Sequence, residues 1–138
     1  MTTDFKTIYD TFDTELSLVL TEDVVRAYES YKPTTRQSYV RITVLPSESI
    51  NISQGIDSWI EHSGLVQVDV ITPANTETHF NIINTVVNRF NGKRKYPNAL
   101  QIDRAWMGSS TYENDWIVSP VLCRYRYFVD SVGVDDIW

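Results

Sequence analysis

Two segments of the chain carry apolar side chains at the spacing of three and four residues that places them on one face of an α-helix. The first stripe, in residues 4–20, consists of Phe5, Ile8, Tyr9, Phe12, Leu16 and Val19. The second stripe, in residues 76–91, consists of Phe80, Ile83, Val87 and Phe90. Residues suited to capping flank both segments, namely Thr2 or Thr3, Asn75 or Thr76, and Gly92. The pattern therefore predicts two amphipathic helices.

Alternation of apolar and polar residues, which is typical of β-strands, is clear in residues 39–45 and 65–71. Pro46 and Pro73 are expected to end these strands, because proline cannot donate a hydrogen bond into a sheet. The other predicted segments are a weak strand at 24–30, a polar loop at 47–62, strands at 100–107 and 116–129, and a loose tail at 130–138 that orders on contact.

The order of these elements is helix, three strands, helix, two strands. Strands and helices in that order predict an α+β fold, with a mostly antiparallel or mixed sheet of about five strands and both helices on one face. The chain has 138 residues, which suits a single domain over residues 1–138.

Charge narrows the possible partners. The 18 acidic residues outnumber the 12 basic ones, giving a net charge of −6, so the chain lacks the positive surface of a protein that wraps nucleic acid. The longest apolar runs, such as residues 16–20, are far shorter than the roughly 20 residues that cross a bilayer. The first residues show no signal-peptide pattern, so we expect a cytosolic product with no membrane partner.

Candidate catalytic chemistry is sparse. Neither His62 nor His79 has another ligand at a metal-binding spacing, and Cys123 lies among apolar residues of a predicted strand, which favours an inert buried thiol. Glycine-rich phosphate-binding and serine-nucleophile motifs do not occur in the sequence. We therefore expect no enzyme activity, no catalytic residue, no metal site and no cofactor.

Aromatic residues and arginine alternate along the last predicted strand, from Arg124 through Tyr125, Arg126 and Tyr127 to Phe128. Both faces of this strand are large and adhesive, although a monomer needs only one such face. Arginine, tyrosine and tryptophan are the residues that protein interfaces favour. We predict that this strand contacts another subunit.

Two further segments are predicted to join that interface. One is the loop that contains Trp59, and the other is the basic turn formed by Lys93, Arg94 and Lys95. The basic turn follows the second helix, so its charge is also explained by the negative end of the helix dipole. A contact with a phosphate or with acidic residues of a partner is the alternative.

The order and spacing of several short motifs resemble the tail terminator and tail completion proteins of long-tailed bacteriophages. The motifs are Val25-Arg26-Ala27-Tyr28-Glu29, the strand from Tyr39 to Pro46, Gly64-Leu65-Val66-Gln67-Val68-Asp69-Val70, the helix end Arg89-Phe90-Asn91-Gly92, and Pro120-Val121 followed by Arg124-Tyr125. The chain departs from the family where Pro73-Ala74-Asn75-Thr76 precedes the second helix and where Ser30 follows Glu29. The resemblance covers residues 5 to 129.

The resemblance implies a structural virion protein that forms a homo-oligomeric ring, usually a hexamer, on the head-proximal end of the tail tube. Such a ring stops polymerisation of the tube protein and presents a joining surface to the head completion or neck protein. Its place is the neck end of the virion tail, after assembly in the host cytoplasm. DNA passes through the lumen without being a specific ligand.

An acidic lumen would repel DNA and let it slide. The candidate lumen residues are Asp13, Glu15, Glu22, Asp130, Asp135 and Asp136. A solvated helix face is the simpler explanation for the N-terminal acidic residues. Two other functions remain open: another head-tail connector or neck protein, and a monomeric protein-binding module that takes over a host factor.

Overall fold

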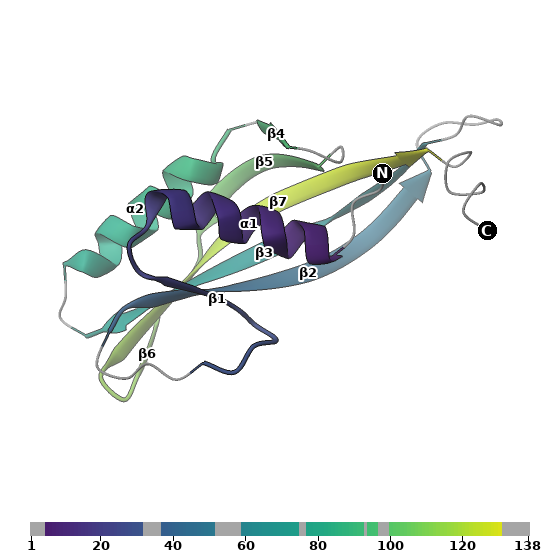
Figure 1. The fold of residues 1–138 in the computed structure, drawn as a ribbon. Helices are drawn as coiled ribbons and strands as arrows, with labels where there is room; N and C mark the ends of the chain where they lie inside the picture. Colours follow the sequence, from purple (N-terminus) through teal and green to yellow (C-terminus); the bar gives the residue numbers. More distant parts are fainter. Residues whose placement is uncertain are drawn as a thin grey trace.

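Two helices lie on one face of a curled, mixed sheet of seven strands (Figure 1). The computed structural model describes residues 5–31, 37–51, 59–74, 77–92, 94–96 and 100–130. The helices are α1 (Phe5–Val19) and α2 (Thr78–Phe90). The strands are β1 (Asp23–Arg26), β2 (Tyr39–Asn51), β3 (Trp59–Pro73), β4 (Arg94–Tyr96), β5 (Leu100–Met107), β6 (Thr111–Glu113) and β7 (Trp116–Asp130).

The strands are arranged in the order β1-β2-β3-β7-β5-β4, and β6 pairs with β7 beyond the end of β5. The β1–β2 pair is parallel and every other pair is antiparallel. Pro120 lies inside β7 at the junction between β5 and β6. Its carbonyl accepts a hydrogen bond from the Gly108 N–H at 2.7 Å, just beyond the end of β5.

The prediction of an α+β domain with both helices on one face is confirmed, but the number of strands is wrong. Seven strands are present where about five were expected, because β4 and β6 have three residues each, too few for alternation to be recognised. The polar loop expected at 47–62 is also wrong. β2 continues to Asn51 and β3 starts at Trp59, so this region extends a hairpin.

Pro46 does not end its strand. It pairs with Gly64, and the register then shifts by one residue before Ser49 pairs with His62, which is the signature of a β-bulge. Pro73 is the last residue of β3, as predicted. The strand expected at 24–30 is shorter than predicted and ends at Arg26.

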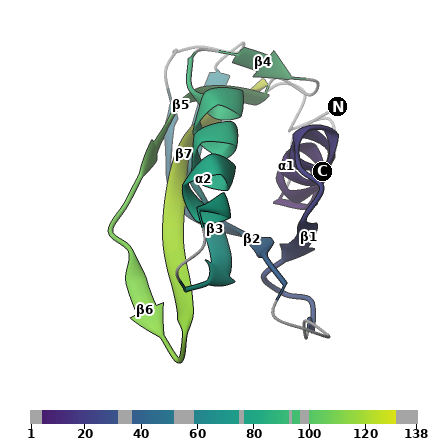
Figure 2. The same ribbon diagram turned by 90° about the vertical axis from the view of Figure 1, so that its left-hand side faces the viewer.

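One continuous core lies between the helices and the sheet. Its α1 residues are Ile8, Phe12 and Leu16, and the rings of Phe12 and Phe90 meet at 4.5 Å between centroids. The sheet contributes alternate residues from four strands: Val40 and Ile42; Val66, Val68 and Val70; Leu100, Ile102 and Ala105; Val121, Cys123, Tyr125 and Tyr127. Figure 2 shows the two helices side by side over this face.

The buried stripe of α2 differs from the predicted one. Phe80 was expected in the core but is 57% exposed, and His79 takes a core position instead. The His79 ring is held by hydroxyls at both nitrogens, with Nδ1 2.8 Å from Thr72 Oγ1 and Nε2 2.7 Å from Ser119 Oγ. Ser119 Oγ is in turn 2.6 Å from Ser110 Oγ. Because both ring nitrogens are satisfied, burying this polar ring costs little.

Burial in this hydroxyl cluster lowers the pKa of His79, so the neutral ring is the buried form. One ring nitrogen then donates and the other accepts. The cluster joins the first turn of α2 to β3 and β7. His79, Thr72 and Ser119 are closed off from solvent, which gives His79 a structural role.

Gly92 follows α2 with a φ of +103°, as expected for a glycine beside a helix C-terminus. Asn91 is the C-cap residue, and its N–H donates to the carbonyl of Val87 at 2.8 Å. The N-cap residue of α2 is Glu77, whose side chain makes no capping hydrogen bond. The predicted caps Thr2, Thr3, Asn75 and Thr76 lie outside the described residues.

Candidate interaction surface

The sheet face opposite the helices carries no described helix (Figure 2). On the central strand β7, Tyr125 and Tyr127 point into the core, whereas Arg124 and Arg126 alternate with them on the opposite, open face. The two faces of the strand predicted to be adhesive therefore have different surroundings. One is covered by the protein's own helices, and the other is open.

Two arginines lie directly opposite each other on this open face. Arg104 of β5 is the register partner of Arg124 of β7, and both residues are exposed. The Arg104 guanidinium lies over the ring of Trp106, 4.7 Å from its centroid. Among the described residues, no carboxylate forms an ion pair with either arginine. Like charges placed opposite each other destabilise a sheet, so the pair is a surplus of positive charge without an internal partner.

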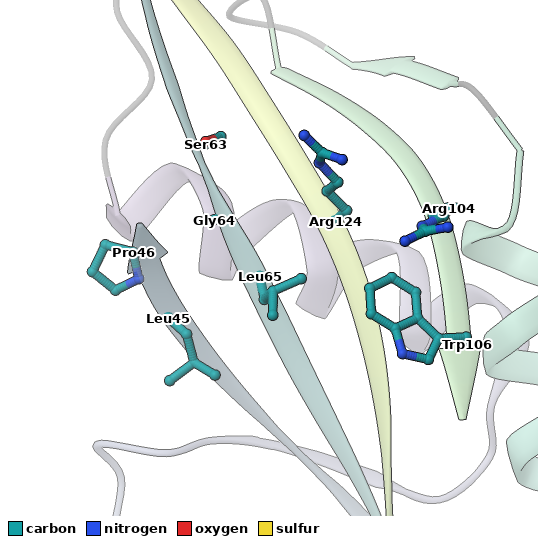
Figure 3. A pocket seen from close by; sticks show the side chains of 8 residues that line it. All are labelled: Leu45, Pro46, Ser63, Gly64, Leu65, Arg104, Trp106 and Arg124. Carbon is teal, nitrogen blue, oxygen red and sulfur yellow. The ribbon is translucent and has the colours of Figure 1, made fainter. Parts of the chain in front are cut away.

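A shallow pocket of about 500 Å³ lies beside this pair (Figure 3). This arginine pocket is lined by Leu45, Pro46, Ser63, Gly64, Leu65, Arg104, Trp106 and Arg124. Figure 3 shows that its residues come from β2, β3, β7 and β5, with Leu45 and Leu65 at one side and the Trp106 ring at the other. The pocket therefore combines apolar walls with two guanidinium groups.

The backbone of Gly64 is part of this pocket for a steric reason. A Cβ atom at position 64 would come within 2.5 Å of the Leu45 carbonyl oxygen and 2.7 Å of the Tyr125 hydroxyl oxygen. Only glycine lets the Tyr125 side chain pack across β3 at this point. Gly64 therefore borders both the arginine pocket and the core.

Other charges on the open face are paired within the chain. Arg41 donates to Asp69 at 3.1 Å, and Gln67 donates to the same carboxylate at 2.8 Å. Arg126 lies between two carboxylates, 3.6 Å from Glu61 and 3.5 Å from Asp103. These pairs distinguish Arg41 and Arg126 from the arginines of the pocket.

The β6–β7 hairpin extends the sheet at the end away from the long β2–β3 hairpin (Figure 1). Its two turn residues, Asn114 and Asp115, have φ values of 46° and 69°, which is the backbone geometry of a tight type I′ turn. Tyr112 is 73% exposed, the most exposed of the large hydrophobic side chains described, and Glu113 is exposed beside it. Because they are consecutive residues of a strand, Tyr112 and Glu113 project from opposite faces of this short hairpin.

The structure places the predicted interface residues in different environments. Arg124 is exposed, Arg126 is half-buried, and Lys95 is exposed on β4. Tyr125 and Tyr127 are buried in the core and are not available to a partner. Burial raises the pKa of Tyr125 to about 12, and it raises the pKa of the Cys123 thiol, which keeps both groups protonated.

Some predicted interface residues are described only by their backbone, or not at all. Trp59 pairs with Asp130, Phe128 pairs with Glu61, and Arg94 pairs with Ile102, while their side chains lie outside the described part of the structure. Lys93 lies outside the described residues.

The candidate lumen acids divide in a similar way. Asp13 is 3.0 Å from Arg26, and Glu15 is 3.1 Å from Arg89, so these two carboxylates hold α1 against β1 and α2. Glu22 is half-buried just before β1. The side chain of Asp130 and the whole of Asp135 and Asp136 lie outside the described part. A carboxylate paired with an arginine adds less negative potential to a lumen than an unpaired one. Asp13 and Glu15 are therefore weaker lumen candidates than the sequence indicated.

Sequence reasoning missed three features of this surface: Arg104, Trp106 and the exposed Tyr112. Arg104 and Trp106 lie on a predicted strand, but the alternation pattern does not say which strands are neighbours. Tyr112 lies on β6, which is too short for alternation to be recognised. Within the described ranges, no three His, Cys, Asp or Glu side chains gather in a way that would hold a metal ion. None of the described helices is long and apolar enough to cross a membrane.

Comparison with known proteins establishes the fold and leaves the function open. No family model matches the chain, and no curated protein matches it. A solved protein whose name states no function superposes with a TM-score of 0.67 at 18% sequence identity, over 90% of this chain and 95% of the other. At that identity the likeness shows the mixed α+β fold alone.

Proposed function

We propose that this chain is a tail terminator subunit of a long-tailed bacteriophage, which forms a ring on the head-proximal end of the tail tube. The observation that carries the proposal is the open sheet face, where Arg104 and Arg124 have no described ionic partner and lie beside an apolar pocket. Arginine and aromatic residues on a surface of this kind favour contact with another protein.

A subunit that associates through two different surfaces forms a closed ring if the rotation between neighbours closes. Tail terminators, which the sequence resembles, act in this way. One side of the ring caps the tube and the other side presents a surface to the neck, so growth stops because the ring offers no second tube-like face.

Tube polymerisation tests this proposal directly. Purified tail tube protein is polymerised with its tape-measure protein, with and without this chain, and tube lengths are measured by electron microscopy. We expect tubes of one length, each capped at one end, and a ring of about 96 kDa if six copies of the 16.0 kDa chain assemble. Tubes that continue to lengthen in the presence of this chain would contradict the proposal.

A charge-reversal variant that should still fold accompanies this test. Replacing Arg104 and Arg124 by glutamate leaves the core untouched, because both side chains are exposed. We expect this variant to fold but to cap fewer tubes. A monomeric host-directed module, the alternative function, would leave tube length unchanged with either protein.

A further inference from the structure

We propose that the arginine pocket binds a small organic phosphate, namely a phosphate monoester whose organic group is apolar or aromatic. Arg104 and Arg124 hold the phosphate group, and the apolar walls of the pocket hold the organic group. The inference concerns the isolated chain and does not depend on the proposed ring.

The charge of the two arginines is the feature that requires an anion. Every other arginine whose side chain the structure describes forms an ion pair, and these are Arg26, Arg41, Arg89 and Arg126. Arg104 and Arg124 form none within the described part of the chain, although acidic residues outnumber basic ones in the sequence. The pair is therefore left with positive charge in a chain that is negative as a whole.

The carboxylates on either side of the pocket are already used. Glu61 and Asp69 lie on β3, each four residues from Leu65, so all three side chains share the open face. Glu61 is paired with Arg126, and Asp69 is paired with Arg41. Neither carboxylate can move to the pocket without leaving another arginine unpaired.

The placement of the two arginines allows one anion to contact both. Register partners on one face of a sheet have Cβ atoms about 4.5–5.5 Å apart, and both exposed side chains can turn towards a shared ligand. The Arg104 guanidinium lies over Trp106, and Arg124 extends towards the end of the pocket at which Ser63 lies (Figure 3). The Ser63 hydroxyl makes no hydrogen bond within the described residues, so it offers a further donor.

The amount of charge favours a phosphate monoester over other anions. Two guanidinium groups carry two positive charges, and a phosphate monoester carries about −1.5 to −2 at pH 7 on three strong acceptor oxygens. A single carboxylate or a phosphodiester carries one negative charge and leaves one arginine without a counter-charge. Guanidinium N–H groups also form paired, charge-assisted hydrogen bonds with phosphate oxygens.

The pocket is larger than a phosphate group alone requires. Its volume of about 500 Å³ is within the range of roughly 300–1,000 Å³ that small-molecule sites usually have. Leu45 and Leu65 line one side and the Trp106 ring lines the other (Figure 3). These walls suit an apolar or aromatic group attached to the phosphate.

Calorimetric titration with model compounds tests the class of ligand. Phenyl phosphate, phenyl sulfate and methyl phosphate are each titrated into the chain at about pH 7.5, where the phosphates are mostly dianions, with sodium chloride holding the ionic strength constant. Phenyl sulfate has the shape of phenyl phosphate but only one negative charge, so we expect it to bind roughly tenfold more weakly. We expect methyl phosphate also to bind more weakly than phenyl phosphate, because it leaves the apolar walls uncovered.

Substitutions locate the binding site on the chain. Arg104→Gln and Arg124→Gln should each weaken the binding of phenyl phosphate roughly tenfold or more, because each removes a charged donor. Arg41→Gln is the matched control, since it removes one positive charge from the same face at a residue that is paired with Asp69 and lies four residues along β2 from Leu45. It should leave the affinity nearly unchanged. Circular dichroism checks that the three variants fold, as expected for substitutions of exposed arginines.

Leu45→Ser tests the apolar wall separately from the charge. Leu45 is 39% exposed, so its replacement should leave the core intact. We expect this variant to bind phenyl phosphate more weakly and methyl phosphate as well as the unmodified chain does. Equal losses for the two compounds would mean that the organic group does not lie against Leu45, and would overturn that part of the proposal.

Four results would overturn the phosphate site as a whole. They are the absence of phenyl phosphate binding at millimolar concentration, equal affinity for phenyl sulfate, equal affinity for the aromatic dicarboxylate benzylmalonate, and a loss with Arg41→Gln as large as that with Arg124→Gln. Duplex DNA that binds more tightly than phenyl phosphate, and is lost with the same arginines, would assign the pocket to nucleic acid instead.

Tube capping separates this inference from the proposed function. Specific binding of phenyl phosphate together with uncapped tail tubes would leave the phosphate site standing and contradict the proposed function. Normal capping by a chain that does not bind phenyl phosphate would do the reverse.

Discussion

The two faces of β7 have the same alternation of large side chains but different partners. On the helix side, Tyr125 and Tyr127 are buried in the core. On the other side, Arg126 lies between Glu61 and Asp103, while the register partners of Arg124 are Arg104 and Leu65. The difference shows that one strand can be fully satisfied by its own domain on one face and leave an arginine without a described ionic partner on the other.

The physical basis of that difference is the number of partners each side chain finds within its own chain. Buried aromatic rings are stabilised by apolar contacts, which the two helices provide. Guanidinium groups need acceptors, and the chain supplies them to Arg126 but not to Arg124. Substitutions on the covered face should therefore lower the free energy of unfolding, whereas substitutions on the open face should change self-association.

The largest effect is expected from Tyr125→Ala, on the covered face. Removing a fully buried aromatic side chain should lower the free energy of unfolding by about 3–5 kcal/mol. Arg124→Ala, one position earlier and on the open face, should change it by less than about 0.5 kcal/mol. Urea denaturation followed by circular dichroism measures both values. Similar losses from the two variants would show that the open face is also part of the folded core.

Gly64→Ala should have the next largest effect, because position 64 joins the two faces. The added methyl group would meet the Leu45 carbonyl and the Tyr125 hydroxyl, which should cost about 1–3 kcal/mol of unfolding free energy. Gly108→Ala is the matched control. Its nearest contact is the Pro120 side chain at 3.0 Å, so a smaller loss is expected in the same denaturation experiment. A larger loss at position 108 would contradict this account of Gly64.

Acidification should lower the free energy of unfolding, because it protonates His79 on the covered face. Burial lowers its pKa in the folded chain, so between that value and the ordinary value of 6.5 the unfolded chain binds more protons. The resulting stability is fully present above pH 6.5 and is lost as the pH falls through the lowered pKa. We expect the unfolding free energy of the unmodified chain to fall on acidification from pH 7 more steeply than that of His79→Gln.

The difference between those two curves isolates His79, since the two proteins share all their other ionisable groups. His79→Gln keeps a polar side chain next to Thr72 and Ser119, so it should fold at neutral pH. Parallel curves for the two proteins between pH 7 and pH 5 would refute the assignment.

Much of the fold follows from the sequence, because local periodicity decides it. The strand at residues 100–107 and both helices are placed within a few residues of their observed bounds. Phe80 was assigned to the core because apolarity was the only criterion, whereas the core accepts His79 once Thr72 and Ser119 supply hydrogen bonds from distant strands. Those partners are 7 and 40 residues away, beyond any local pattern.

The candidate site was predicted less completely for the same reason. The sequence indicated Arg124 and Arg126 on one adhesive strand, but only the sheet order brings Arg104 and Trp106 beside Arg124. The bulge between Ile102 and Arg104 sets that register, and its position is a property of the paired strands. Tyr125 and Tyr127 were assigned to the interface because alternation shows that two faces differ without showing which of them the helices cover.

The smallest effect is expected from Arg124→Gln, and its sign distinguishes the two faces most sharply. Removing one of two opposed guanidinium groups, while leaving Arg104 over Trp106, should raise the unfolding free energy of the isolated chain by about 0.2–0.5 kcal/mol. The gain should shrink in 1 M salt, because salt screens repulsion between exposed charges. The same substitution should weaken self-association. A variant that is less stable at low salt would mean that Arg124 contributes to the fold of its own chain, whereas greater stability combined with weaker association is expected of a residue kept for a neighbouring subunit.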